Sequence, residues 1–181
     1  MRETLRTSEG FVLRAWTEAD VPALLRAFEP YEMRWQHSGS PIDTRESALD
    51  WITLRQEAWR AGTGYVFAVT DDADAVLGCM GVTAIDRRHD IGWVSYWTMA
   101  AAQGRGVASS AAIAVSEWAF SDLGLYRLEL GHRTDNLASC KVATRAGFAV
   151  EGIERAKLRY GDQRYDSEMH ARLATDPKPA G

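Results

Sequence analysis

The segment Gln103-Gly104-Arg105-Gly106-Val107-Ala108-Ser109 lies between the end of a predicted strand and the first turn of a predicted helix. Its two glycines, Gly104 and Gly106, allow the backbone to come close to a ligand. The first N–H groups of a helix have no partners within that helix, so they can converge on an anion, which the helix dipole also attracts. The segment therefore predicts a main-chain binding site for a pyrophosphate group, assisted by the side chain of Arg105.

Three classes of phosphate-binding loop compete for this pattern of glycines. A Walker loop requires a lysine after its glycines, and the segment has none, which excludes a nucleotide-hydrolysing loop. A dinucleotide-binding loop requires a third glycine where Ser109 stands, in a tight turn after the strand, whereas the apolar strand here ends several residues before Gly104. The third pattern, Q/R-x-x-G-x-G/A, is satisfied by Gln103, Gly106 and Ala108. A helix start with small residues for close packing is the alternative without a ligand.

The residues around this segment show two kinds of hydrophobic pattern. Alternating or continuous apolar runs predict strands at residues 11–16, 65–70, 76–84, 91–99, 126–131, 148–152 and 165–173. Apolar residues at helical spacing predict helices at residues 17–29, 43–59, 105–123 and 136–146. Three consecutive strands followed by strand–helix alternation predict an α/β fold, with a mixed, mostly antiparallel sheet of about seven strands and helices on both faces.

The composition is that of one ordinary domain. The chain has 181 residues, of which 46% are hydrophobic and 25% are charged. We expect a single domain over residues 1–175 and a flexible tail over residues 176–181. The 21 Lys and Arg residues against 25 Asp and Glu give a net charge of -4, which excludes the basic surface typical of nucleic-acid-binding proteins. An anionic ligand must therefore be held locally.

Several other classes of protein and site are not expected. No segment approaches the roughly 18 apolar residues of a membrane span, and residues 1–10 carry no apolar leader, so we expect a cytoplasmic protein that contacts no membrane. Cys79 and Cys140 are isolated and make no disulfide framework. No metal is expected, because the four histidines match no metal-binding spacing: His37, His89, His132 and His170.

A second segment, residues 135–148 followed by Glu151-Gly152, contains the pattern N-x-x-S...G-F..E-G. Together with the glycine segment and the order of elements, it makes the chain resemble the GNAT acetyltransferases over about residues 5–174. Within that family it is similar to the RimL and RimJ branch of ribosomal-protein N-terminal acetyltransferases. The resemblance implies the GNAT fold and direct transfer of the acetyl group of acetyl-CoA to a primary amine in a ternary complex. The acceptor would be a protein N-terminus or a small-molecule amine, and homodimers are common in this branch.

The resemblance also assigns roles to individual residues. Gln103, Gly106 and Ala108 would hold the pyrophosphate of coenzyme A, Asn136 its pantetheine arm, and Ser139 would protonate the departing thiolate. The implied cofactor-binding set is Trp97, Thr98, Met99, Gln103, Gly104, Arg105, Gly106, Val107, Ala108, Ser109, Asn136, Ser139 and Lys141.

Asn136 and Ser139 are also compatible with purely structural roles. Asn136 could simply cap a helix, a role that asparagine fills well, and Ser139 could be an ordinary first-turn serine. Many members of the family place a tyrosine seven residues after the asparagine, but that position is Ala143 here and cannot donate a proton. A covalent acyl intermediate on Cys140 is not expected, because no histidine or aspartate is suitably placed in the sequence to activate it.

The general base is not defined by the sequence. In the RimL branch a glutamate after the Glu-Gly pair is thought to act through water, but Lys157 or Leu158 stands at the corresponding place. The remaining acidic candidates are Asp90, at the start of a predicted strand, and Glu129, in the strand before Asn136. An α-amine is roughly 10% neutral at pH 7, whereas a lysine amine is neutral only ~0.04% of the time. The lack of an obvious base therefore favours an acceptor with a low-pKa amine.

Two tryptophans are candidates for contact with the acceptor. Trp35 lies in an irregular aromatic segment, residues 31–41, which in this family overhangs the acceptor site, and Trp97 is expected to reach the same cleft. A non-catalytic acyl-CoA-binding module on the same fold is the alternative function, motivated by the missing glutamate. A dinucleotide-dependent oxidoreductase is a further alternative.

Overall fold

A single sheet is the framework of the molecule. The computed structural model describes residues 4–31, 33 and 41–179. Within these residues the chain forms an eight-stranded sheet in the order β1-β2-β3-β4-β5-β6-β8-β7, in which all neighbours are antiparallel except β5 and β6. The strands are β1 Leu5–Arg6, β2 Val12–Ala15, β3 Tyr65–Thr70, β4 Val76–Asp86, β5 Ile91–Thr98, β6 Arg127–Arg133, β7 Ala149–Tyr160 and β8 Gln163–Leu173.

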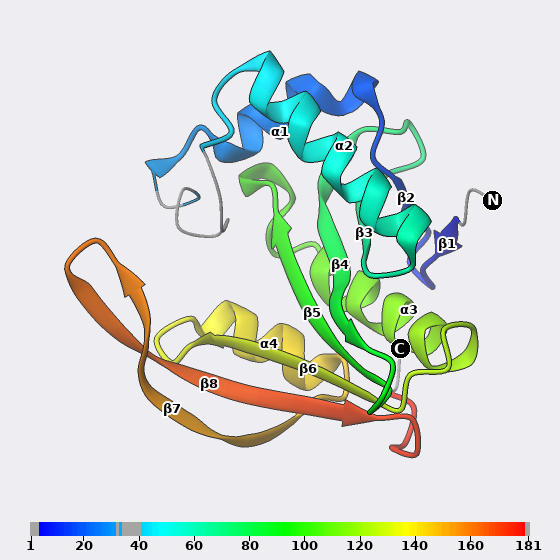
Figure 1. Cartoon of the computed structure of the whole chain (residues 1–181), viewed down its shortest axis with the longest axis vertical. Helices are drawn as coiled ribbons and strands as arrows, with labels where there is room; N and C mark the ends of the chain where they lie inside the picture. Colours follow the sequence, from blue (N-terminus) through cyan, green and yellow to red (C-terminus); the bar gives the residue numbers. More distant parts are fainter. Residues whose placement is uncertain (1–3, 32, 34–40, 180–181) are drawn as a thin grey trace.

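Helices cover both faces of this sheet (Figure 1). They are α1 Val21–Phe28, α2 Arg45–Ala61, α3 Val107–Ser121 and α4 Leu137–Arg145, with short 3-10 helices η1 Glu18–Asp20 and η3 Ala100–Ala102 before α1 and α3. The Thr44 side chain caps α2 by accepting a hydrogen bond from the Ser47 N–H at 3.1 Å. The helix ends at Gly62, whose φ of 69° favours glycine. In the described part of the chain, no helix has both the length and the apolar character needed to cross a bilayer.

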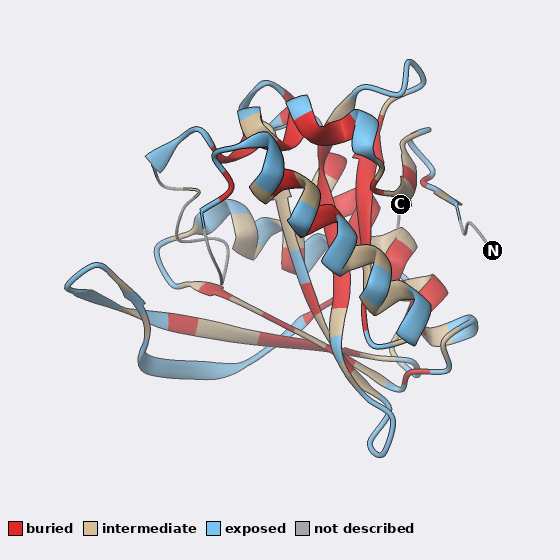
Figure 2. Cartoon of the chain, turned by 45° about the horizontal axis from the view of Figure 1, so that its top comes forward, coloured by how far each residue is buried: buried red, intermediate tan, exposed pale blue. Residues whose placement is uncertain are grey.

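Two hydrophobic cores lie on opposite faces of the central strands (Figure 2). One packs α3 against the sheet and includes Phe67 and Trp118. The other packs α1 and α2 against the opposite face and includes Trp16 and Val66. Consecutive residues of β3 therefore enter different cores, which explains why this strand is apolar throughout instead of alternating with polar residues.

The strands β5 and β6 are joined over a short distance only. Beyond Trp93, β5 stays paired with β4 as far as Thr98, and β6 stays paired with β8 as far as Arg133. The two strands therefore separate, and the sheet opens like a V whose two sides are visible in Figure 1. The parallel pairing comprises Ile91 with Arg127, Gly92 with Leu128 and Trp93 with Glu129.

The fold class and the order of the predicted elements are confirmed, with two differences. The sheet gains an eighth strand because Leu5–Arg6 is a two-residue strand, too short to show a hydrophobic pattern. The strand β7 continues to Tyr160, beyond its predicted end at Gly152. Almost every residue of β7 is exposed, so its sequence carries no alternation between a buried and a solvated face.

Gly92 lies at the apex of the V in a tightly packed position. A Cβ atom there would come within 2.8 Å of Val82 Cγ1 and 2.9 Å of Leu125 Cδ1. We expect Gly92→Ala to lower the free energy of unfolding by about 1–3 kcal/mol through overpacking, as measured by urea denaturation. Gly64→Ala is the control, because its added Cβ meets atoms no closer than 3.5 Å. Equal losses of stability in the two variants would contradict the packing argument.

Candidate active site

The backbone before α3 presents open hydrogen-bond donors. Gly106 is the N-cap of α3 with a φ of 81°, and Gly104 has a φ of 75°. Within the described ranges, no protein group accepts a hydrogen bond from the backbone N–H groups of residues 104–109. The helical bonding begins with the Ser110 N–H, which donates to the Gly106 carbonyl at 3.0 Å. A Cβ atom added at either glycine would meet nothing within 4 Å. The loop thus offers main-chain donors at the positive end of a helix dipole, with space in front of them.

A cavity of 480 Å³ opens beside these donors, and we call it the α3 cavity. Every residue of the cofactor-binding set predicted from the sequence lines it, except Met99 and Arg105. Met99 follows the end of β5, and its N–H is used by the sheet, because it donates to the Leu77 carbonyl of β4 at 2.8 Å. Four separate segments of the chain meet at this cavity: Met33, the end of β5, the glycine loop and α4 with its N-cap.

A second cavity of 680 Å³, which we call the α2 cavity, lies beside α2 at the opening of the V. Helix α2 contributes Trp51 and Arg55 to its wall, and β6 contributes His132 and Arg133. The two cavities adjoin each other and share part of their walls. Among the described residues, those that line both cavities are Tyr96, Trp97, Asn136 and Ser139.

Hydrogen bonds hold the backbone in place where the cavities meet. Asn136 caps α4, because its Oδ1 accepts a hydrogen bond from the Ser139 N–H at 3.1 Å. The Tyr96 hydroxyl donates to the Ser139 carbonyl at 3.2 Å, and burial raises the pKa of Tyr96. The capping role that the sequence leaves open for Asn136 is therefore present. This role uses only its carbonyl oxygen, which leaves the hydrogens of Nδ2 without a protein acceptor in the described part of the chain.

Arg55 is a partly buried cation in the wall of the α2 cavity. Its guanidinium lies 4.7 Å from the ring centroid of Trp51, and burial lowers the pKa of Arg55. No carboxylate of the described residues forms an ion pair with it. The neighbouring Cys79 thiol is uncharged, because burial raises its pKa to about 12. A partly desolvated cation is stabilised by a nearby anion, so Arg55 is a candidate to bind a negatively charged group of a ligand.

The two tryptophans predicted to contact the acceptor have different outcomes. Trp97 lines both cavities, and its ring packs against Trp16 and Phe28 with centroid separations of 5.9 and 5.8 Å. These contacts hold the indole in one place on the wall. Trp35 lies outside the described residues, and its contact with an acceptor stays a prediction.

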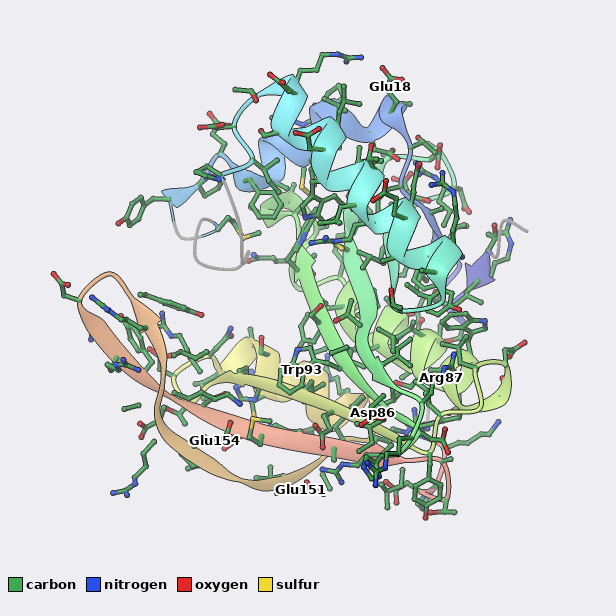
Figure 3. The ribbon with its side chains drawn as sticks, viewed as in Figure 1. Glu18, Asp86, Arg87, Trp93, Glu151 and Glu154 are labelled. Carbon is green, nitrogen blue, oxygen red and sulfur yellow. The ribbon has the colours of Figure 1, made fainter. Side chains whose placement is uncertain are left out.

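The structure does not bring the acidic candidates for the general base to either cavity. Asp90 is exposed in the turn before β5, about 23 Å along that strand from Trp97 by the usual rise per residue. Figure 3 shows Asp86, the last residue of β4, and Arg87, which belongs to the same turn as Asp90, at the closed end of the V. Glu129 accepts a hydrogen bond from Arg127 Nε at 2.7 Å. Of the residues that replace the family's glutamate, Leu158 lines the α2 cavity, whereas Lys157 pairs with Glu154.

Tyr96 and Arg55 are site residues that no sequence motif singled out. Tyr96 directly precedes Trp97, Thr98 and Met99 of the predicted cofactor-binding set, so its position was a usable signal. Arg55 follows Trp51 by one helical turn, on the helix that the apolar spacing predicts at residues 43–59. The sequence signal that could have identified Arg55 is a charged residue one helical turn after an aromatic residue of the apolar face, because the two side chains then lie on the same side of the helix.

The chain is similar to known acetyltransferases over most of its length. The family model of the acetyltransferase (GNAT) domain matches residues 11–149. The chain is 31% identical to the probable N-acetyltransferase YjcK of Bacillus subtilis over 127 residues, covering 69% of this chain and 70% of that protein. It is 27% identical to the ribosomal-protein-serine acetyltransferase of Escherichia coli over 180 residues, covering 96% of this chain and 98% of that protein. The structure of Mycobacterium smegmatis RimJ in complex with CoA-disulfide has the same fold, with a TM-score of 0.82, 21% identity and coverage of 96% of this chain and 87% of that chain.

The glycine loop generates a test of ligand binding. We expect Gly106→Val to weaken binding of coenzyme A by at least about tenfold, because a side chain would fill the space in front of the open N–H groups. Isothermal titration calorimetry measures the affinity. Gly124→Val, near the other end of α3, is the matched control: its φ of 66° imposes similar backbone strain, and an added Cβ also meets nothing within 4 Å. An affinity loss shared by both variants would show that backbone strain is responsible, and not a side chain in front of the open N–H groups of the glycine loop.

Proposed function

The chain belongs to the GNAT acetyltransferase family, in its RimL-like branch, and we propose that it performs acetyl transfer from acetyl-CoA to a primary amine where its two cavities meet. The single observation that carries this proposal is the meeting of the α3 and α2 cavities at Tyr96, Trp97, Asn136 and Ser139. A reaction between two bound molecules requires such a junction, because both reacting atoms must be held in contact.

The α3 cavity fits coenzyme A on the chemistry of its donors. The open N–H groups of residues 104–109 suit a pyrophosphate, and Asn136 Nδ2 suits an amide carbonyl of the pantetheine arm. When bound, acetyl-CoA supplies a thioester carbonyl, which an amine can attack. The backbone groups of β5 beyond Trp93 that face β6 have no partner on that strand, so they are available to orient the thioester and to stabilise its developing negative charge.

Ser139 is the proposed donor of a proton to the departing thiolate. It lines both cavities, and its backbone is held by Asn136 from one side and by Tyr96 from the other. The Tyr96 hydroxyl, at the same junction, carries its proton at neutral pH because burial raises its pKa. Its hydrogen bond to the Ser139 carbonyl makes Tyr96 a positioning residue for Ser139.

No carboxylate of the described residues is placed to take a proton from the acceptor amine. In the described part of the α2 cavity wall, no aspartate or glutamate is present. His132 is in this wall, but its Nδ1 lies 2.9 Å from the Arg133 carbonyl and its Nε2 lies 3.0 Å from His170 Nε2, so both ring nitrogens face protein atoms. Solvent is then the proton acceptor, which favours an α-amine over a lysine amine because far more of it is neutral at pH 7.

The charge of the α2 cavity indicates the rest of the acceptor. Arg55 has no ion-pair partner among the described residues, whereas Arg133 is already paired with Asp135. We therefore propose an acceptor that carries a negatively charged group within reach of Arg55 while its α-amine lies at the junction. An amino acid, or a peptide with an acidic residue near its N-terminus, has this arrangement of charges. The residues Trp51 and Trp93 offer apolar wall around it.

The role of Ser139 is tested by steady-state kinetics with thiol release as the measurement. We expect Ser139→Ala to lower kcat by roughly 100-fold while changing the dissociation constant of acetyl-CoA by less than about threefold, because the hydroxyl acts on the leaving group. Ser95→Ala is the control, since Ser95 lines only the α2 cavity. Wild-type turnover in Ser139→Ala would assign the proton to another group. Absence of amine-dependent thiol release in the unmodified protein would favour the non-catalytic acyl-CoA-binding module instead.

The role of Arg55 is tested by comparing acceptors that differ only in charge. We expect Arg55→Ala to raise KM at least about tenfold for an amino acid with a free carboxylate and to change KM little for its amide, because only the first can pair with the guanidinium. Arg60→Ala, an exposed arginine on the same helix, is the control. If the carboxylate and the amide respond equally to Arg55→Ala, the proposed anionic group does not bind there.

A further inference from the structure

Four side chains with metal-binding atoms gather between α4 and the strands β6 and β8. They are His132, Cys140, Glu168 and His170, and their ligand atoms all lie within 4.8 Å of one another. The antiparallel register of β6 and β8 pairs His132 with Glu168 and Leu130 with His170, so the two histidines and the glutamate share one face of the sheet. The first turn of α4 adds Cys140, whose N–H donates to the Asn136 carbonyl at 3.1 Å.

The neutral imidazole rings in this cluster carry too few hydrogens to form a hydrogen bond at each of their short contacts. The Nδ1 atom of His132 lies 2.9 Å from the Arg133 carbonyl oxygen, which can only accept, so Nδ1 carries the hydrogen. In a neutral ring, the Nε2 atom of His132 then carries no hydrogen and has a free lone pair. This Nε2 lies 3.0 Å from His170 Nε2, which in turn lies 2.9 Å from Glu168 Oε1. At most one hydrogen, on His170 Nε2, is therefore available for two short contacts, one with His132 Nε2 and one with Glu168 Oε1.

The surroundings of the cluster do not supply the missing positive charge. Glu168 forms no ion pair with a lysine or arginine among the described residues; its charged partners there are the two histidines. Both histidines are buried, with 7% of His132 and 1% of His170 exposed. When His170 instead carries its hydrogen on Nδ1, which lies 3.5 Å from the Phe148 carbonyl oxygen, the Nε2 atoms of both rings carry lone pairs. A carboxylate and two imidazole lone pairs that converge in this way are stabilised by a cation placed between them.

We propose that these four side chains bind a Zn²⁺ ion. Two imidazole nitrogens, a thiolate and a carboxylate oxygen form a donor set that Zn²⁺ binds in tetrahedral geometry. Ligand atoms around such an ion stand about 3.3–3.8 Å apart for bonds of about 2.0–2.3 Å. Here His170 Nε2 lies 2.9 Å from Glu168 Oε1 and 3.0 Å from His132 Nε2, and His132 Nε2 lies 3.6 Å from Glu168 Oε1. The contact of His132 Nδ1 with a backbone carbonyl is the support that metal-ligating histidines usually have.

The ion would have a structural effect beside the acetyl-transfer site. With four protein ligands the coordination is closed, so no position is left for an activated water. The ion would join α4 to β6 and β8, directly after Ser139 in the chain and next to the wall that His132 gives to the α2 cavity. It would thereby fix the position of α4 relative to one side of the V.

The test measures metal binding directly and does not depend on acetyltransferase activity. The full chain, stripped with a chelator, is titrated with Co²⁺ as a spectroscopic probe and then with Zn²⁺ in competition. We expect one equivalent to bind, with a thiolate-to-cobalt charge-transfer band and visible absorption typical of tetrahedral cobalt. Zn²⁺ should displace the Co²⁺ and raise the Tm of the chain.

Variants show whether the four side chains are the ligands. We expect Cys140→Ser to remove the charge-transfer band, and Cys140→Ser and Glu168→Gln each to weaken Zn²⁺ binding by at least about tenfold, with circular dichroism confirming that both fold. Cys79→Ala and His89→Gln are the matched controls, because they remove a cysteine and a histidine outside the cluster. The proposal is overturned if the unmodified chain binds no stoichiometric metal. It is also overturned if the Cys79 and Cys140 variants bind metal equally.

Discussion

The separation of β5 from β6 is the constraint on which the rest of the structure depends. Because their pairing stops after Trp93, backbone groups of β5 are left for a ligand, and cavities beside α2 and α3 can meet through the sheet. A fully paired sheet would place a continuous wall between them. The strands can part at little cost in hydrogen bonds, because each keeps an antiparallel neighbour, β4 for one and β8 for the other.

The parts of the fold and site that depend on short stretches of chain were predictable from the sequence. The glycine loop before α3 and the asparagine before α4 each act within one helical turn, so their residue types alone indicate a helix start with free or capped donors. The order of strands and helices follows in the same way from local hydrophobic patterns. The two exceptions have local causes too: β1 is too short to show a pattern, and β7 has no buried face.

Features that depend on how distant segments come together were not predictable. Asp90 and Glu129 are acidic residues near the right strands, but strand direction places Asp90 at the closed end of the V, and an arginine partner engages Glu129. Arg55 becomes notable only when the structure shows that no carboxylate of the described residues pairs with it. His132 and His170 match no metal-binding spacing in the sequence, yet the register of β6 and β8 makes them neighbours.

The outer edge of the sheet has a consequence for the behaviour of the protein at high concentration. Among the described strands, β7 pairs with β8 alone, so its other side presents backbone groups that no strand pairs with, and such an edge can template aggregation by strand addition. Two register shifts and a positive φ of 51° at Ala156 bend this edge, and Figure 3 marks two of its charged residues, Glu151 and Glu154. Irregular backbone and dense charge are the features that discourage edge-to-edge association. The charged residues of β7, which interrupt the hydrophobic pattern of a strand in the sequence, therefore also discourage association of folded chains through this edge.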